Sequence, residues 1–77
     1  MNTEHLVEMA NDIATYFAFE SQHAEAVDSV ATHLRKYWEP RMRKEIVAYL
    51  AAGGGGLDPL ARDAVVRIGE LDSNKAA

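Results

Sequence analysis

The chain has 77 residues, a net charge of −4 at neutral pH and no cysteine. This length allows one domain with one small core, and the missing cysteines exclude disulfides, thiolate zinc sites, iron–sulfur ligation and cysteine nucleophiles. The negative charge argues against general affinity for nucleic acid or anionic membranes, and no apolar run approaches the roughly 18 residues of a membrane span. We therefore expect a cytoplasmic protein whose small core is supplemented by docking on a partner.

The first predicted helix covers residues 4–19. Asn2 or Thr3 can cap its N-terminus, and Glu4 suits the first helical turn. Its apolar side chains recur at a spacing of three or four residues and so share one face: Leu6, Met9, Ala10, Ile13 and Phe17.

The second predicted helix covers residues 22–38, with Ser21 as its N-cap. The same spacing recurs at Val27, Val30, Ala31, Leu34 and Trp38. Pro40 should end this helix near Trp38, because the residue before a proline avoids the helical conformation, and proline suits the first turn of a following helix.

The third predicted helix covers residues 41–51 and the fourth residues 59–71. Four glycines at 53–56 must stop the third helix. They are interpreted as a flexible joint and not as a phosphate-binding loop. Such a loop requires a preceding strand and a following Lys-Ser or Lys-Thr, and neither is present. Asp58 and Pro59 are typical of a helix start, and residues 72–77 are interpreted as a frayed tail. The inward faces of the two helices are predicted to carry Met42, Ile46, Tyr49 and Leu50 in the third, and Leu60, Ala64, Val65, Ile68 and Leu71 in the fourth.

The predicted fold class is therefore all-α, because no segment alternates apolar and polar residues as a strand does. Periodicity leaves open whether the four short helices close a compact bundle or form an open array that a partner must cover. The three histidines do not have the spacing of a helical zinc site or a zinc finger, and no Ser, His and Asp arrangement specific to catalysis is present.

Residues 34–44 are the segment most typical of a binding surface. They combine the single tryptophan, a tyrosine and a methionine with five of the eight basic residues around the turn at Pro40. Trp, Tyr, Met and Arg are enriched at protein–protein interfaces. For Trp38, a place in the core and a place at the contact are equally compatible with the pattern. The candidate partner-binding residues are Arg35, Trp38, Pro40, Arg41, Met42 and Arg43.

Three segments of the chain resemble a known family. They are residues 38–43, with the sequence WEPRMR, residues 56–60, GLDPL, and residues 6–11, LVEMAN, followed by Ile13 and Ala14. Together they resemble the small delta subunit of cytoplasmic NAD-dependent formate dehydrogenase. The similarity extends over about residues 6 to 68, and the first two segments are specific as a pair.

The resemblance implies an accessory subunit without catalytic, cofactor or metal sites of its own. In that family the alpha, beta and gamma subunits carry a molybdopterin cofactor with molybdenum or tungsten, iron–sulfur clusters, FMN and the NAD site. The resemblance implies that the delta subunit supports assembly, stability or cofactor insertion by binding the catalytic alpha subunit. The implied partners are therefore other subunits, with no nucleic acid and no membrane.

Two alternatives stay open on the sequence alone. A helix-turn-helix regulator would place the basic third helix in a nucleic-acid groove, although the acidic total and the shortage of Asn and Gln on that helix count against it. A self-associating helical bundle without a foreign partner is the other alternative.

Overall fold

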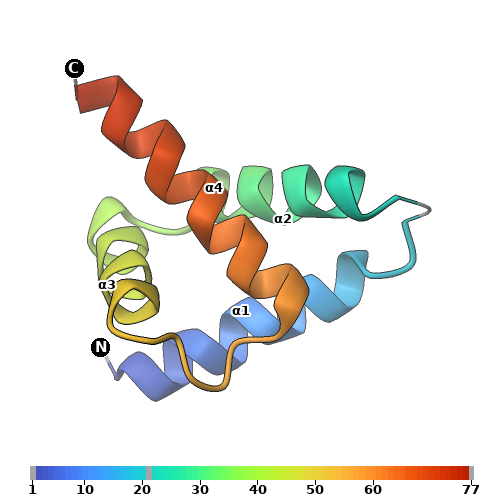
Figure 1. Ribbon diagram of the computed structural model, residues 1–77, viewed down its shortest axis with the longest axis horizontal. Coiled ribbons are helices and arrows are strands. Elements are labelled where there is room, and N and C mark those ends of the chain that lie inside the picture. Colours follow the sequence, from blue (N-terminus) through green and yellow to red (C-terminus); the bar gives the residue numbers. More distant parts are fainter. Residues whose placement is uncertain (1, 21, 77) are drawn as a thin grey trace.

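The computed structural model describes residues 2–20 and 22–76, with side chains described as far as residue 73. Its regular elements are four helices: α1 (Thr3–Phe17), α2 (His23–Tyr37), α3 (Pro40–Ala51) and α4 (Pro59–Ala76) (Figure 1). No strand is present among the described residues, so the all-α prediction is confirmed. The predicted N-cap Ser21 lies outside the described residues.

Local chemistry explains where the helices begin and end. The Asn2 side chain accepts a hydrogen bond of 2.8 Å from the Glu4 N–H, so Asn2 rather than Thr3 caps α1. Glu39, which precedes Pro40, is extended with φ −67° and ψ 152°, and Pro40 itself opens α3. The proline therefore sets the corner between α2 and α3.

The last helix is longer than the sequence pattern indicated. α4 continues to Ala76, whereas residues 72–77 were predicted to be a frayed tail. Asp72 lies between two arginine side chains from α2 and α3, and these contacts hold the helix beyond its last apolar turn. Apolar spacing alone marked the end of the helix at residue 71.

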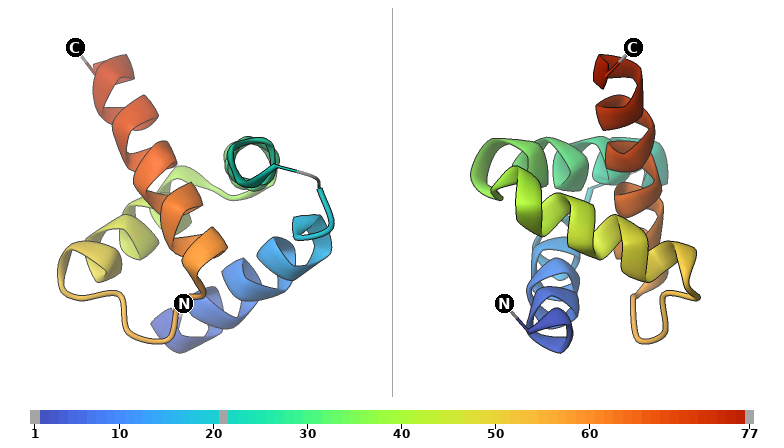
Figure 2. Two further views of the ribbon diagram at one scale, coloured as in Figure 1. Left: turned by 45° about the vertical axis from the view of Figure 1, so that its right-hand side comes forward. Right: turned by 90° about the vertical axis from the view of Figure 1, so that its left-hand side faces the viewer.

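The core lies where the four helices meet, and α4 contacts each of the other three (Figure 2). The radius of gyration is 11.3 Å, which matches the value of about 11.5 Å expected for a compact chain of this length. The fold is thus a compact bundle and not an open array. The largest fully buried side chains come from all four helices: Leu6, Val30, Leu34, Ile46, Val65 and Ile68.

The four-glycine segment between α3 and α4 adopts one hydrogen-bonded conformation. Gly53, Gly54 and Gly56 have φ values of +133°, +64° and +89°. Residues other than glycine rarely adopt such positive values. The Arg62 guanidinium donates to the Gly54 carbonyl at 3.1 Å, and the Tyr49 hydroxyl donates to the Gly55 carbonyl. The predicted flexible joint is therefore tied to both helices that flank it.

A side chain of α1 fastens the far end of the same segment. The Asn11 amide donates to the Gly56 carbonyl at 2.8 Å, and its oxygen accepts from the Asp58 N–H at 2.9 Å. Both partners lie more than forty residues along the chain from Asn11. We call this pair of hydrogen bonds the Asn11 clamp; it fixes where α4 begins relative to α1.

Candidate functional site

The corner between α2 and α3 places the predicted partner-binding residues at very different depths. Trp38 is only 5% exposed and belongs to the core. Glu39, Pro40 and Arg41 are exposed, and Met42 is half-buried against the core. The structure therefore assigns the tryptophan to packing, one of the two places the sequence allowed, and leaves the proline and Arg41 accessible.

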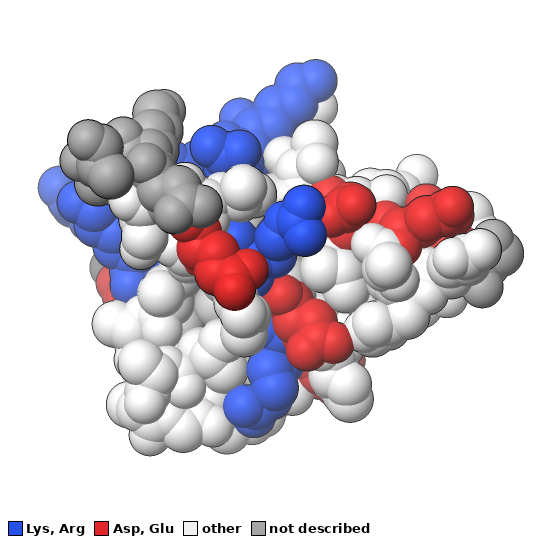
Figure 3. Space-filling model, turned by 45° about the horizontal axis from the view of Figure 1, so that its top comes forward, with Lys and Arg blue, Asp and Glu red and all other residues white. Residues whose placement is uncertain are grey.

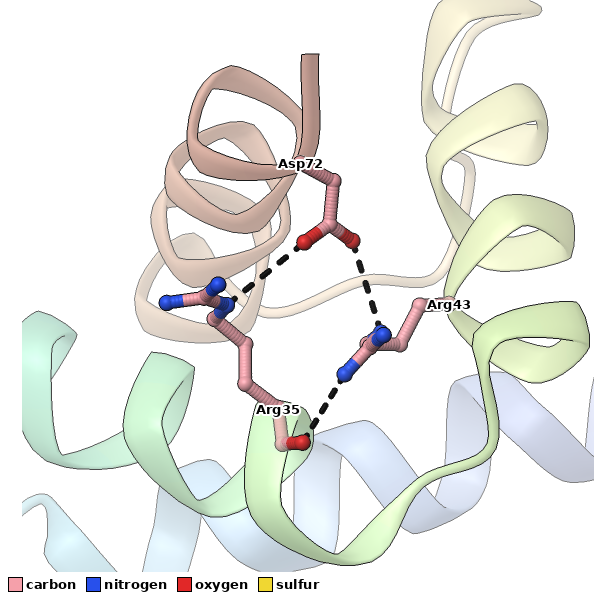
Figure 4. A network of polar contacts seen from close by, with 3 residues as sticks. All are labelled: Arg35, Arg43 and Asp72. Atoms are coloured by element: carbon pink, nitrogen blue, oxygen red, sulfur yellow. Dashed lines mark hydrogen bonds and ion pairs between the residues drawn. The ribbon is translucent and has the colours of Figure 1, made fainter. Parts of the chain in front are cut away.

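Arg43 is held within the chain and is poorly accessible to a partner. Its Nη1 donates to the Arg35 carbonyl at 2.8 Å, close to the end of α2, where the helix dipole favours a cation. Its Nε lies 3.4 Å from Asp72 Oδ2, and the side chain is 15% exposed. Arg43 thus joins α2, α3 and α4 (Figure 4).

Arg35 contacts the same carboxylate as Arg43, and its side chain is more exposed to solvent. Its Nε lies 3.5 Å from Asp72 Oδ1, and its side chain is 37% exposed (Figure 4). One carboxylate therefore faces two guanidinium groups, and the three side chains carry one net positive charge. The expectation that both Arg41 and Arg43 project toward a partner does not fit this geometry, because Arg43 is used inside the fold.

Exposed cations remain around the corner. Arg41, Lys36 and Lys44 form no ion pair with any other residue of the described part of the chain. A shallow hollow of about 520 Å³ lies beside them, lined by Thr32, Arg35, Lys36, Trp38, Pro40 and Arg43. We call the exposed cations Arg35, Lys36, Arg41 and Lys44 the cationic corner. Its chemistry suits carboxylates of another protein.

The surface charge is unevenly distributed. On the face drawn in Figure 3, acidic side chains lie at the end where α2 begins and across the middle, next to basic ones, and further basic side chains lie along the left and upper edges. In the sequence, the first 28 residues carry six carboxylates and no Lys or Arg. Uneven charge of this kind favours oriented docking on another charged surface.

A row of aromatic side chains was not predicted as a unit from the sequence. We call it the aromatic strip: Tyr16, Phe17, Phe19, His33 and Tyr37. It begins at the end of α1 and continues along α2 to the cationic corner. The predicted inward face included Phe17 but not its aromatic neighbours. Tyrosine and phenylalanine at off-face positions of an amphipathic helix are the signal that could have identified the strip.

The polar side chains away from the corner do not assemble a metal site. His23 Nε2 lies 2.6 Å from Asp63 Oδ2, which joins the start of α2 to α4. Within residues 2–20 and 22–73, no three His, Asp or Glu side chains lie close enough together to hold a metal ion. The chain also has no cysteine. No described helix has the combination of length and apolar character needed to span a bilayer.

Comparison with known proteins places most of the chain in a known family. Residues 5–65 match the family described as the NADH-dependent formate dehydrogenase delta subunit, FdsD. Neither the curated proteins nor the solved structures contain a significant match. The matched range includes α1 from its third residue onward, the whole of α2 and α3, the cationic corner and the Asn11 clamp.

Proposed function

The chain belongs to the family of NADH-dependent formate dehydrogenase delta subunits, and from this membership we propose that it is a non-catalytic accessory subunit that binds the catalytic alpha subunit. The beta and gamma subunits belong to the same complex in this proposal. The bound chain supports assembly, stability or insertion of the molybdenum cofactor, and the complex works in the cytoplasm. Molybdopterin with molybdenum or tungsten, the iron–sulfur clusters, FMN and NAD are held by the other subunits.

The family match over residues 5–65 carries the proposal. The cationic corner supplies a surface for docking: Arg41 is exposed in the first turn of α3, which Pro40 opens, and it has no ion-pair partner among the described residues. A guanidinium binds a carboxylate with two parallel hydrogen bonds, and its planar fork loses less side-chain entropy for each hydrogen bond formed than a lysine does. We therefore assign the first contact with the alpha subunit to this corner.

Co-purification from the native cell tests the proposal. The tagged wild-type chain should retrieve the formate dehydrogenase alpha subunit, identified by mass spectrometry. Arg41→Glu should reduce the amount retrieved about tenfold, because reversing an interface charge costs on the order of 1–3 kcal/mol of binding free energy. Arg67→Glu is the control: it reverses an exposed cation on α4 that pairs with Asp28 at 3.5 Å, away from the corner, and it should retain capture.

Two results would contradict the proposal. A wild-type chain that retrieves no formate dehydrogenase subunit refutes the accessory role. Deletion of the chain's gene that leaves formate dehydrogenase activity, complex assembly and cofactor content unchanged refutes it as well. Equal loss of capture by Arg41→Glu and Arg67→Glu would instead refute the assignment of the contact to the corner.

A further inference from the structure

The aromatic strip exposes more apolar surface than the fold of this chain requires. Tyr16, Phe19 and Tyr37 are 70%, 79% and 64% exposed. Since each ring side chain offers about 150–250 Å² of surface, the three leave roughly 400 Å² in solvent. Contiguous apolar patches of this size on a small protein typically mark a binding surface.

The rings are ordered by contacts with one another. The Tyr16 ring meets the Phe17 ring edge to face with centroids 5.0 Å apart, and Phe17 meets His33 at 6.1 Å. The His33 and Tyr37 centroids lie 4.7 Å apart. A surface already ordered in the free protein loses little side-chain entropy when a partner covers it.

The strip is continuous with the cationic corner. The Lys36 ammonium lies 5.4 Å from the centroid of the Tyr37 ring, and Tyr37 directly precedes Trp38 at the turn. A stable interface of standard size covers about 800 Å² on each partner, so the exposed rings supply about half of it. The adjoining cations provide the polar remainder.

The dimensions of the strip suit a helix. Its rings form one line of contacts from Phe19 through Tyr16, Phe17 and His33 to Tyr37, with centroids 6.5, 5.0, 6.1 and 4.7 Å apart. A narrow apolar row of this kind matches the apolar stripe of an amphipathic helix. A hollow of about 360 Å³ at its middle, lined by Phe17, Asp28, Ser29, Thr32 and His33, has room for an apolar side chain with a polar rim. Because the cationic corner adjoins the strip only at Tyr37, a helix that lies along the strip would meet the cations at one of its two ends.

We propose that the aromatic strip and the cationic corner form one docking surface for an amphipathic helix of the alpha subunit. The apolar face of that helix covers Tyr16, Phe19 and Tyr37, and carboxylates at one of its ends pair with Lys36 and Arg41. This inference rests on the accessory role proposed above and adds to it the larger, apolar part of the contact.

Tyrosine modification in the intact complex tests the surface without any substitution. Tetranitromethane should nitrate Tyr16 and Tyr37 in the isolated chain and at least about fivefold more slowly in the complex, with both sites quantified by mass spectrometry. Tyr49, half-buried and hydrogen-bonded to Gly55, is the internal reference and should change little. Equal nitration of Tyr16 and Tyr37 in both states, in a complex that contains the alpha subunit, overturns the inference and leaves the accessory role standing.

A variant provides the second test. The triple change Tyr16→Gln, Phe19→Gln and Tyr37→Gln should reduce capture of the alpha subunit at least about tenfold, because buried aromatic rings dominate interface energetics and glutamine keeps good helix propensity. Val66→Gln removes an exposed apolar side chain outside the strip and should retain capture. Helical circular dichroism checks the fold of both variants.

The outcomes separate the two proposals. If the triple variant folds and retrieves the alpha subunit as well as the wild type does, the strip is not the contact and the accessory role stands. If the wild type itself retrieves no formate dehydrogenase subunit, the accessory role and this inference both fail. If the triple variant does not fold, the nitration result decides.

Discussion

Removing the Asn11 clamp should destabilise the bundle measurably. Asn11→Ala deletes the donor to the Gly56 carbonyl and the acceptor for the Asp58 N–H. Because both hydrogen bonds are exposed, water can replace them in part, and each contributes about 0.5–1 kcal/mol. The clamp is thus worth about 1–2 kcal/mol of the free energy of unfolding.

The comparison needs a control for helix propensity, because alanine favours a helix over asparagine by about 0.5 kcal/mol. Asp12→Ala brings a similar gain at the neighbouring exposed position of α1 and removes no hydrogen bond or ion pair among the described residues. The Asn11→Ala variant should therefore melt about 4–16 °C below Asp12→Ala, since 1 kcal/mol shifts the midpoint of a domain this small by about 4–8 °C. Thermal unfolding followed by circular dichroism at 222 nm measures the difference.

Hydrogen exchange locates the effect. The Asp58 amide should exchange faster in Asn11→Ala than in Asp12→Ala, whereas the Gly54 amide, bonded to the Tyr49 carbonyl, should keep its protection. Coincident melting curves and unchanged Asp58 exchange would refute the reasoning that a side chain of α1 holds the start of α4.

Two further substitutions test assignments made above. Trp38→Ala should cost about 3–5 kcal/mol, comparable to the whole stability of a single core of this size, so the variant should lose most helical circular dichroism at 25 °C; a folded variant would show that the ring is not core. Gly54→Ala should cost at least about 1 kcal/mol in urea unfolding, because φ is +64° and a Cβ would lie 2.7 Å from Leu50 Cδ1. Gly55→Ala should change the stability little, because φ is not positive there and a Cβ would meet only the Tyr49 hydroxyl oxygen, at an ordinary contact distance of 3.7 Å. Equal midpoints for these two alanine variants would contradict the backbone argument.

Local spacing predicted the part of the fold that depends on neighbours in sequence. Leu6, Leu34, Ile46 and Ile68 were each placed on an inward face by the recurrence of apolar residues at three or four positions, and each is fully buried. Pro40 fixed the corner because its effects on the backbone are local.

Contacts between distant residues could not be predicted in this way. Asp72 was interpreted as part of a frayed tail because nothing in the sequence around it shows that Arg35 and Arg43 lie opposite. The Asn11 clamp likewise joins polar groups whose proximity arises only from the tertiary fold. The sequence pattern placed Arg43 in a basic segment but did not show that its guanidinium contacts the Arg35 carbonyl and Asp72.

The candidate surface was therefore predicted in part. The segment around Pro40 is indeed where exposed cations gather, and Arg41 is accessible as expected. Trp38 lies in the core, since its position continues the inward face of α2. The exposed rings of Tyr16 and Phe19 were not predicted, because apolar periodicity identifies the buried face of a helix and gives no signal for side chains outside that face.

The contact of α4 with all three other helices has a consequence for biosynthesis. α1, α2 and α3 leave the ribosome first, yet they lack Ala61, Val65 and Ile68, around which their apolar faces close. Folding must therefore wait until the last of the four helices has been translated. Until then the apolar faces of α1, α2 and α3 are only partly covered, and any binding that depends on the folded surface follows the docking of α4.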